Sequence, residues 1–139
     1  MANTLHLQII TPKKVIVDEQ IQSATVTTAD GEITVLPRHS RLFSLLVDGV
    51  VTIKKEKSEE DHLSIGGGYL ETDGKHLNIL VSRAHGQDQI DAQMTQKALE
   101  QAKKILSSSK DQVERHEATL LLRRSLVDLK LLTKRKRVR

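Results

Sequence analysis

The chain has 139 residues, 37% of them hydrophobic and 29% charged, which suits one full domain or a small domain with an appendage and excludes disorder as its main character. Phe43 and Tyr69 are its only aromatic residues and it has no cysteine, which argues against base-stacking nucleic-acid readers and excludes disulfide frameworks and thiolate metal sites. The net charge of +4 is unevenly placed, because five positive charges lie in the last six residues: Lys134, Arg135, Lys136, Arg137 and Arg139.

Neither a membrane span nor a targeting segment is visible in the sequence. No stretch approaches the roughly 20 apolar residues that a membrane-spanning helix requires. Residues 1–6 have neither a cationic flank nor a long apolar segment, so they do not resemble a signal peptide. We therefore expect a cytoplasmic location, with a membrane-bound assembly as an open option.

Short strands with turn signals between them fill the first half of the chain. Residues 5–9 alternate apolar and polar side chains, residues 24–28 are rich in β-branched side chains, and Asp73-Gly74 is a strong hairpin signal. Helical segments do not alternate with these strands, so a parallel α/β sheet is not expected. The turn spacing of about 8–12 residues predicts an antiparallel β-sandwich over residues 1–84.

Residues 85–139 change to a helical periodicity, and no Gly or Pro follows Gln87. Asp88 or Asp91 can cap a first helix, and Asp111 can cap a second helix after a run of serines. The predicted fold class is therefore α+β, with the sandwich followed by an antiparallel two-helix hairpin. We call this hairpin the arm.

Two apolar stripes run along the second predicted helix, residues 112–133. The first stripe consists of Ala118, Leu121, Leu122, Leu126, Leu129 and Leu132. The second stripe lies roughly opposite at about 100° per residue and consists of Val113, Leu120, Val127 and Leu131. One stripe is enough to pack on a partner helix, so the second is either a docking face or ordinary exposed apolar surface. Because two helices enclose little interior, we expect the arm to be held by docking on a neighbour.

Candidate catalytic groups do not form a set. The histidines have no i, i+4 pair and are scattered over the chain: His6, His39, His62, His76, His85 and His116. The run Gly66-Gly67-Gly68 lacks the Lys-Ser/Thr that follows a phosphate loop, and we interpret it as a bulge or tight turn in which glycine permits positive φ. We predict a non-catalytic protein without a metal or cofactor.

Four short motifs occur in an order typical of one family. They are Ile9-Ile10-Thr11-Pro12, Gly31-Glu32-Ile33-Thr34-Val35-Leu36-Pro37-Arg38-His39, Gly66-Gly67-Gly68-Tyr69-Leu70-Glu71 and Leu77-Asn78-Ile79-Leu80-Val81. With the chain length and the helical hairpin, they make nearly the whole chain similar to the epsilon subunit of the bacterial and plastid F-type rotary ATP synthase. The family usually has a glycine and a proline where this chain has Arg38 and Arg41, which we interpret as lineage variation.

The resemblance implies a non-catalytic rotor subunit in the central stalk of the proton-transporting ATP synthase, coupling proton flow through the c-ring to ATP synthesis. It implies that the β domain docks on the gamma subunit and the c-ring through Gly31, Glu32, Leu36, Pro37, His39 and Leu42. It implies that the arm either folds on the sandwich or extends along gamma to the alpha and beta catalytic subunits and inhibits ATP hydrolysis. The implied arm contacts to an acidic segment of beta are Arg115, Arg123, Arg124 and Lys130. The implied location is peripheral, at the cytoplasmic face of the cell membrane, without membrane insertion and without a nucleic-acid partner.

Family members that bind ATP on the arm carry Ile/Leu-Asp-x-x-Arg-Ala at the start of the first helix. Ile90 and Asp91 match this motif, but Met94 and Thr95 replace the Arg and the Ala, and a thioether supplies no positive partner for phosphate. The sequence therefore argues against ATP sensing. The alternative to a rotor subunit is a free-standing β-sandwich adaptor whose basic helical tail binds an acidic protein or RNA, and RNA binding would show a steep salt dependence.

Overall fold

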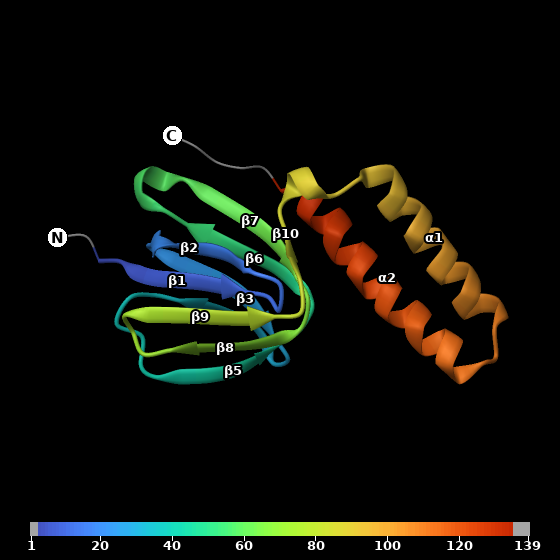
Figure 1. The fold of residues 1–139 in the computed structure, drawn as a ribbon, viewed down its shortest axis with the longest axis horizontal. Coiled ribbons are helices and arrows are strands. Elements are labelled where there is room, and N and C mark those ends of the chain that lie inside the picture. Colours follow the sequence, from blue (N-terminus) through green and yellow to red (C-terminus); the bar gives the residue numbers. More distant parts are fainter. Residues whose placement is uncertain (1–2, 135–139) are drawn as a thin grey trace.

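The computed structural model describes residues 3–134, which form a strand-rich domain followed by two helices (Figure 1). The strands are β1 (Leu5–Ile10), β2 (Val15–Ile21), β3 (Ser23–Thr28), β4 (Gly31–Val35), β5 (Leu42–Leu46), β6 (Gly49–Lys54), β7 (Glu60–Ile65), β8 (Gly68–Thr72), β9 (His76–Val81) and β10 (Ala84–His85). The 3₁₀ turn η1 (Glu56–Ser58) precedes β7, and η2 (Gln87–Gln89) leads into α1 (Ala92–Ser108) and α2 (Gln112–Thr133). The predicted basic tail lies outside the described residues, except for Lys134.

The strands form one curled sheet in the order β10-β7-β6-β3-β5-β8-β9-β1-β2, with β4 paired to β3. Alternate side chains point inward, and Leu5, Leu7 and Ile9 of β1 are accordingly fully buried. The predicted fold class, a β-sandwich followed by a two-helix hairpin, is confirmed. One detail differs from the prediction, because β1 and β9 pair in parallel while the other neighbours are antiparallel. Hairpin signals specify strands that are adjacent in sequence, so they could not indicate this distant pair.

A single apolar core fills the sandwich, and no described residue after Ala84 belongs to it. Burial of each large aliphatic side chain contributes about 1.5–3 kcal/mol, and this core contains many of them. The arm has a small interior of its own, and its buried apolar residues are Leu99, Ala102, Ala118 and Leu131. The sandwich is therefore stabilised without the arm, whereas the arm depends on a surface to rest on.

Asp91 and Asp111 begin the two helices, as predicted. The Asp91 carboxylate accepts hydrogen bonds from the backbone N–H groups of Gln93 and Met94, and that of Asp111 accepts one from Val113. These bonds satisfy amide groups that lack a partner within the first turn of a helix. The helices then pack side by side, and α2 contacts β6 and β7 of the sandwich (Figure 1).

The two predicted stripes of α2 are covered to different degrees. In the first stripe Ala118 is buried, whereas Leu126 is exposed. In the second stripe Leu131 is fully buried, whereas Val113 and Leu120 are exposed. The second stripe is therefore covered at its C-terminal end, where α2 meets the sandwich, and bare at its N-terminal end.

The run Gly66-Gly67-Gly68 permits a close backbone approach rather than a positive φ. Among the described residues, the glycines with positive φ are Gly31 and Gly74. A Cβ atom on Gly68 would lie 2.0 Å from the carbonyl oxygen of Leu80 on β9. Our interpretation of this run as a positive-φ turn is therefore wrong, because Gly68 opens a strand that needs space for its neighbour's backbone.

The substitution Gly68→Ala is expected to destabilise the sandwich, because the backbone of β9 cannot move aside as a flexible side chain could. Overpacking of this kind costs about 1–3 kcal/mol, which should lower the midpoint of urea unfolding. The matched control is Gly67→Ala, whose Cβ would have the Leu46 carbonyl oxygen as its nearest neighbour, at an ordinary contact distance of 3.4 Å. Equal midpoints for the two variants would contradict this account.

Candidate docking surfaces

An apolar row crosses the outer face of the sheet. Leu45 on β5 is the register partner of Tyr69 on β8, Tyr69 is the partner of Leu80 on β9, and Leu80 is the partner of Ile10 on β1. Paired residues of adjacent strands point to the same side of a sheet, so these four side chains lie next to one another. Leu45 is 65% exposed, and the other three are half-buried.

Phe43 extends this row on β5. It is 62% exposed and stacks on Tyr69 with a centroid separation of 5.1 Å. The two aromatic residues of the chain thus lie together on the surface, and we define the apolar row as Ile10, Phe43, Leu45, Tyr69 and Leu80. A contiguous apolar surface of this kind is typical of a protein docking site, in contrast to single exposed apolar residues.

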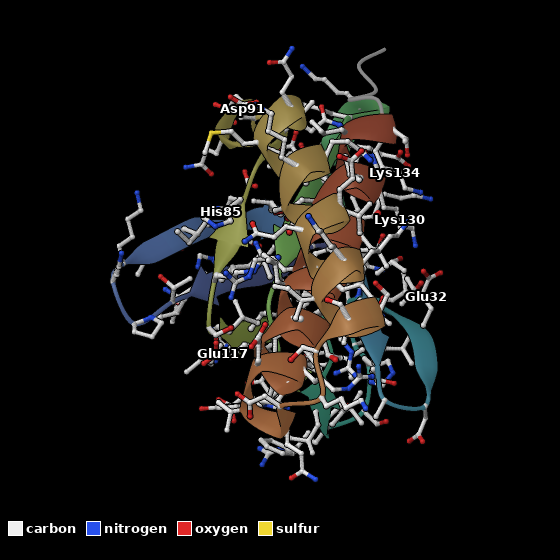
Figure 2. The ribbon with its side chains drawn as sticks, turned by 90° about the vertical axis from the view of Figure 1, so that its right-hand side faces the viewer. Glu32, His85, Asp91, Glu117, Lys130 and Lys134 are labelled. Atoms are coloured by element: carbon white, nitrogen blue, oxygen red, sulfur yellow. The ribbon has the colours of Figure 1, made fainter. Side chains whose placement is uncertain are left out.

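The six predicted rotor-docking residues lie in and after β4, a strand that lies off the main strand order and pairs with β3. Gly31 and Glu32 begin β4 near the arm end of the sandwich, the end that Figure 2 faces. Leu36, Pro37, His39 and Leu42 follow β4 at the opposite end, where Leu36 is exposed. From Gly31, the first residue of β4, to Leu36 the distance along the strand is about 15 Å. The structure therefore places the six residues along one flank rather than at one point, and their role in docking stays a prediction.

The loop after β4 is fixed to the turn between β8 and β9. The backbone N–H of Arg38 donates to the carbonyl oxygen of Gly74 at 2.8 Å, and His39 Nδ1 donates to the carbonyl oxygen of Ser40 at 2.7 Å. Arg38 has a φ of 67°, in the left-handed region that favours glycine. This conformation gives a physical reason for the glycine that the resembled family usually has at this place.

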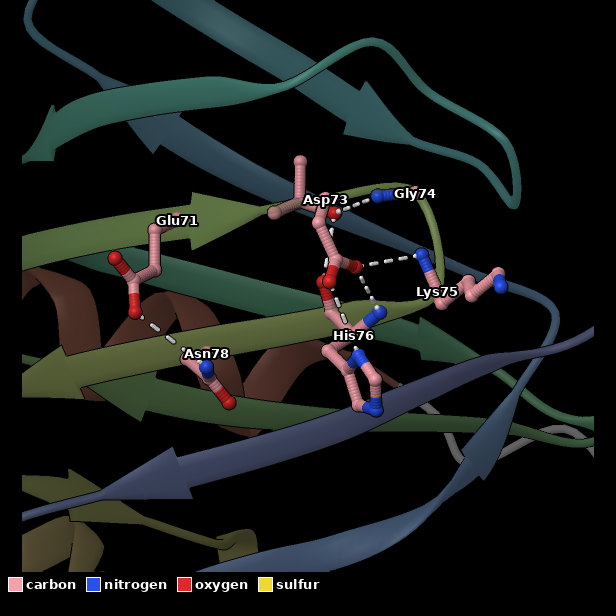
Figure 3. Close-up of polar contacts among 7 residues, drawn as sticks. Glu71, Asp73, Gly74, Lys75, His76 and Asn78 are labelled. Atoms are coloured by element: carbon pink, nitrogen blue, oxygen red, sulfur yellow. Dashed lines mark hydrogen bonds and ion pairs between the residues drawn. The ribbon is translucent and has the colours of Figure 1, made fainter.

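Asp73 organises the β8–β9 turn, which confirms the predicted hairpin (Figure 3). Its Oδ1 accepts hydrogen bonds from the backbone N–H groups of His76 at 2.7 Å and Lys75 at 2.8 Å, and its Oδ2 lies 3.2 Å from His76 Nδ1. The backbone bond from His76, then that from Lys75, holds the pKa of the Asp73 carboxyl well below its usual range. The turn therefore rests on the ionised form of Asp73.

The four predicted arm cations have different surroundings in the structure. Arg115 donates to the carbonyl oxygens of Leu106 at 2.5 Å and Ser109 at 3.2 Å, so it closes the turn between the helices. Arg123 lines a groove of about 580 Å³ between α2 and the β5–β6 turn. Arg124 and Lys130 are exposed elsewhere on α2. Arg115 thus has a role in folding, and the engagement of all four with a catalytic subunit stays a prediction.

The residues at the positions of the ATP motif line a cleft of about 280 Å³ between α1 and α2. Ile90, Asp91, Met94 and Thr95 all lie there, with Arg124 across the cleft. The Asp91 carboxylate is already engaged as the cap of α1, and Met94 is exposed. That this arm does not sense ATP therefore remains a prediction from the sequence.

The scattered histidines make local contacts with polar neighbours. His6 Nε2 lies 2.6 Å from Asp18, and His62 Nδ1 lies 3.0 Å from the Thr52 hydroxyl. Within residues 3–134, no group of three His, Asp or Glu side chains is arranged to hold a metal ion. In the same part of the chain, no helix combines the length and the apolar character needed to cross a membrane.

A β-sandwich followed by a helical hairpin is the architecture of the ATP synthase delta/epsilon chains. Residues 4–87 match the family profile described as "ATP synthase, Delta/Epsilon chain, beta-sandwich domain". The chain is 31% identical over 127 residues to the ATP synthase epsilon chain of Moorella thermoacetica, covering 91% of this chain and 95% of the relative. It is 29% identical over 130 residues to that of Desulforamulus reducens, covering 94% and 98%. The chain belongs to the family of ATP synthase epsilon chains, which confirms the resemblance seen in the sequence.

A solved structure shares the fold over most of the chain. It is a chain in the cryo-EM structure of the Euglena gracilis mitochondrial ATP synthase, with a TM-score of 0.83 and 24% identity, covering 94% of this chain and 81% of that one. At this level of identity the similarity concerns the fold alone.

Sequence reasoning missed the apolar row. A signal was present, because Ile79 and Leu80 are adjacent apolar residues in a strand that should otherwise alternate, which indicates apolar side chains on both faces of the sheet. Phe43 and Leu45 likewise share one face of β5, opposite the buried Leu46. What the sequence lacked was the register that places these strands side by side.

The substitution Asp73→Asn is expected to lower stability more at neutral than at acid pH. A lowered pKa in the folded state means that stabilisation by the carboxylate is present above the ordinary pKa of about 3.9 and is lost as the pH falls below it. The difference in urea midpoint between the unchanged protein and this variant should therefore shrink between pH 7 and pH 3. Glu71→Gln is the control, because the Glu71 carboxylate has one long 3.5 Å bond to Asn78 (Figure 3). A difference for Asp73→Asn that stays constant with pH would refute this explanation.

Proposed function

We propose that the apolar row is the surface by which this ATP synthase epsilon chain docks on the gamma subunit of the rotor. The chain is a non-catalytic subunit of the central stalk, where it couples proton flow through the c-ring to ATP synthesis. The observation that carries the proposal is the row itself, because five adjacent apolar side chains with a stacked aromatic pair gain stability when a partner covers them.

The flank of β4 is the proposed contact with the c-ring. The residues at its two ends, Glu32 and Leu36, are exposed, and the loop beyond Leu36 is held by the Arg38–Gly74 hydrogen bond. A flank about 15 Å long suits a broad partner better than a narrow one. Its loop is fixed by backbone bonds, so little conformational entropy is lost when a partner binds.

The arm is proposed to inhibit ATP hydrolysis when it leaves the sandwich and extends along gamma toward the alpha and beta subunits. Residues 85–139 contain thirteen Lys or Arg against seven Asp or Glu, a net charge of +6, whereas residues 1–84 contain nine against eleven, a net charge of −2. A basic arm on a weakly acidic domain suits an acidic partner segment, and Arg123, Arg124 and Lys130 are exposed for such contacts.

The proposed location is peripheral, at the cytoplasmic face of the cell membrane, as part of the ATP synthase. The alternative, a free-standing adaptor for an acidic protein or RNA, is not favoured because the similarity to epsilon chains extends over both the sandwich and the arm.

The substitution Leu45→Lys is expected to weaken binding to a purified gamma–c-ring subcomplex by about tenfold or more, because a lysine in the row would bury an unpaired charge under the partner. The measurement is the dissociation constant of the full-length subunit. Val113→Lys is the matched control, since Val113 is equally exposed but lies on the arm, away from the row. If both variants bind as the unchanged chain does, the row is not the docking surface.

Removal of residues 89–139 is expected to raise ATP hydrolysis by the reconstituted enzyme while leaving ATP synthesis intact. The shortened chain should still fold and dock, because the described arm residues contribute nothing to the sandwich core. The control removes residues 135–139 alone, which separates the basic tail from the helices. Unchanged hydrolysis after the long truncation would exclude an inhibitory arm and leave the docking proposal standing.

A further inference from the structure

A largely buried polar cluster lies where the arm meets the sandwich. The Ser64 hydroxyl on β7 donates to Asp128 Oδ1 on α2 at 2.5 Å, and two guanidinium nitrogens of Arg83 lie 3.3 Å from the same oxygen. Ser64 is fully buried, and the side chains of Arg83 and Asp128 are each 14% exposed. The cluster joins residues from β7, the segment after β9, and α2, which lie far apart in the sequence.

Ser64 points away from the sandwich core and toward the arm. Its register partner on β6 is Val50, which is 8% exposed and yet does not belong to the core. Paired residues share one face of a sheet, and α2 packs on both β6 and β7. The arm therefore covers Val50 and Ser64, and both would be exposed if the arm left.

The end of α2 is tied to the linker rather than to the sandwich. Gln87 Nε2 in η2 donates to the carbonyl oxygen of Leu131 at 2.7 Å and also to that of Lys134. These carbonyls lie at the C-terminal end of α2, where Leu131 also accepts a bond from the backbone N–H of the capping residue Lys134. Asp128 lies one turn earlier, so it provides the bonds that run from α2 to the sandwich itself.

The chemistry of the cluster suits a reversible contact. Hydrogen bonds to an ionised carboxylate are about twice as strong as neutral ones, so they hold the arm firmly while it is docked. Ser64, Arg83 and Asp128 are each well hydrated in water, so their exposure after release carries no apolar penalty. Removal of one partner while the arm stays docked would leave a charge buried without compensation, which favours the released arm.

We infer that Ser64, Arg83 and Asp128 form a latch that holds the arm on the sandwich, and that loss of this latch releases the arm. The inference rests on the proposed function of the arm for its regulatory meaning, because a latch sets how readily the arm becomes free to inhibit hydrolysis. Opening of the latch is a property of the subunit alone and can be measured without the rest of the enzyme.

The test uses the absence of cysteine from the chain. Val50→Cys places a single thiol under the arm, and its rate of alkylation in the purified full-length subunit reports how often the arm opens. Added Asp128→Asn should accelerate alkylation by about tenfold or more, as expected for the loss of a charge-assisted contact. Glu117→Gln makes the same change of charge at an exposed position of α2 (Figure 2) and should alter the rate by less than about twofold.

A second thiol distinguishes arm release from unfolding. Val26→Cys makes the same substitution in the sandwich core, where Val26 is fully buried, and Asp128→Asn should leave its alkylation rate unchanged. Ser64→Ala should accelerate labelling of Val50→Cys less than Asp128→Asn, and the two effects should combine less than multiplicatively because they remove one shared contact.

Two results would overturn the latch. One is labelling of Val50→Cys that is no faster with Asp128→Asn than with Glu117→Gln. The other is equal acceleration at Val26→Cys, which would mean that the whole sandwich opens. Both readouts use the isolated subunit, so a failure of docking or of inhibition in the assembled enzyme would leave the latch intact, and a failed latch would leave the docking proposal intact.

Discussion

The apolar core of the sandwich consists of residues that precede the helices in the chain. This separation determines how the arm is stabilised. No described side chain beyond Ala84 enters the core, so the arm gains its stability from α1–α2 packing and from a limited contact of α2 with β6 and β7. A helix pair with few buried side chains has a low free energy of local opening compared with the core strands. The strength of the contact between α2 and the sandwich therefore decides how the arm is distributed between positions.

The same core makes the outer face of the sheet a firm surface. Beneath the apolar row lie buried neighbours on the same strands, Ile9, Leu46, Leu70 and Ile79, which fix the backbones of β1, β5, β8 and β9. Side chains on a rigid sheet lose little freedom when a partner covers them, so more of the gain from burial appears as affinity. The rigid sandwich and the detachable arm thus both follow from the end of the apolar core at Ala84.

Features that depend on nearby residues could be predicted from the sequence, and features that depend on register could not. The caps at Asp91 and Asp111 and the Asp73 turn follow from bonds spanning a few residues, and the structure contains all three. The parallel pairing of β1 with β9 and the apolar row require the lateral order of strands, which periodicity does not specify. The contact of Ser64 with Asp128 spans 64 positions, and neither residue type suggests a partner on its own.

The second stripe of α2 resolves into two parts, which bears on how the arm changes position. Leu131 is fully covered near the sandwich, whereas Leu120 and Val127 border an open groove facing Val47 on the β5–β6 turn. The docked arm therefore leaves part of its apolar surface unsatisfied, and another surface that covers Leu120 could compete with the sandwich for it. A partner shifts the arm from one position to the other if it favours the second position by a few kcal/mol. Changing the ratio of the two positions from 1:99 to 99:1 requires about 5.5 kcal/mol. The docked position of α2 leaves apolar surface uncovered and is held by a polar contact, so it does not have to be much more stable than a second position. A difference of a few kcal/mol is then enough to move the arm.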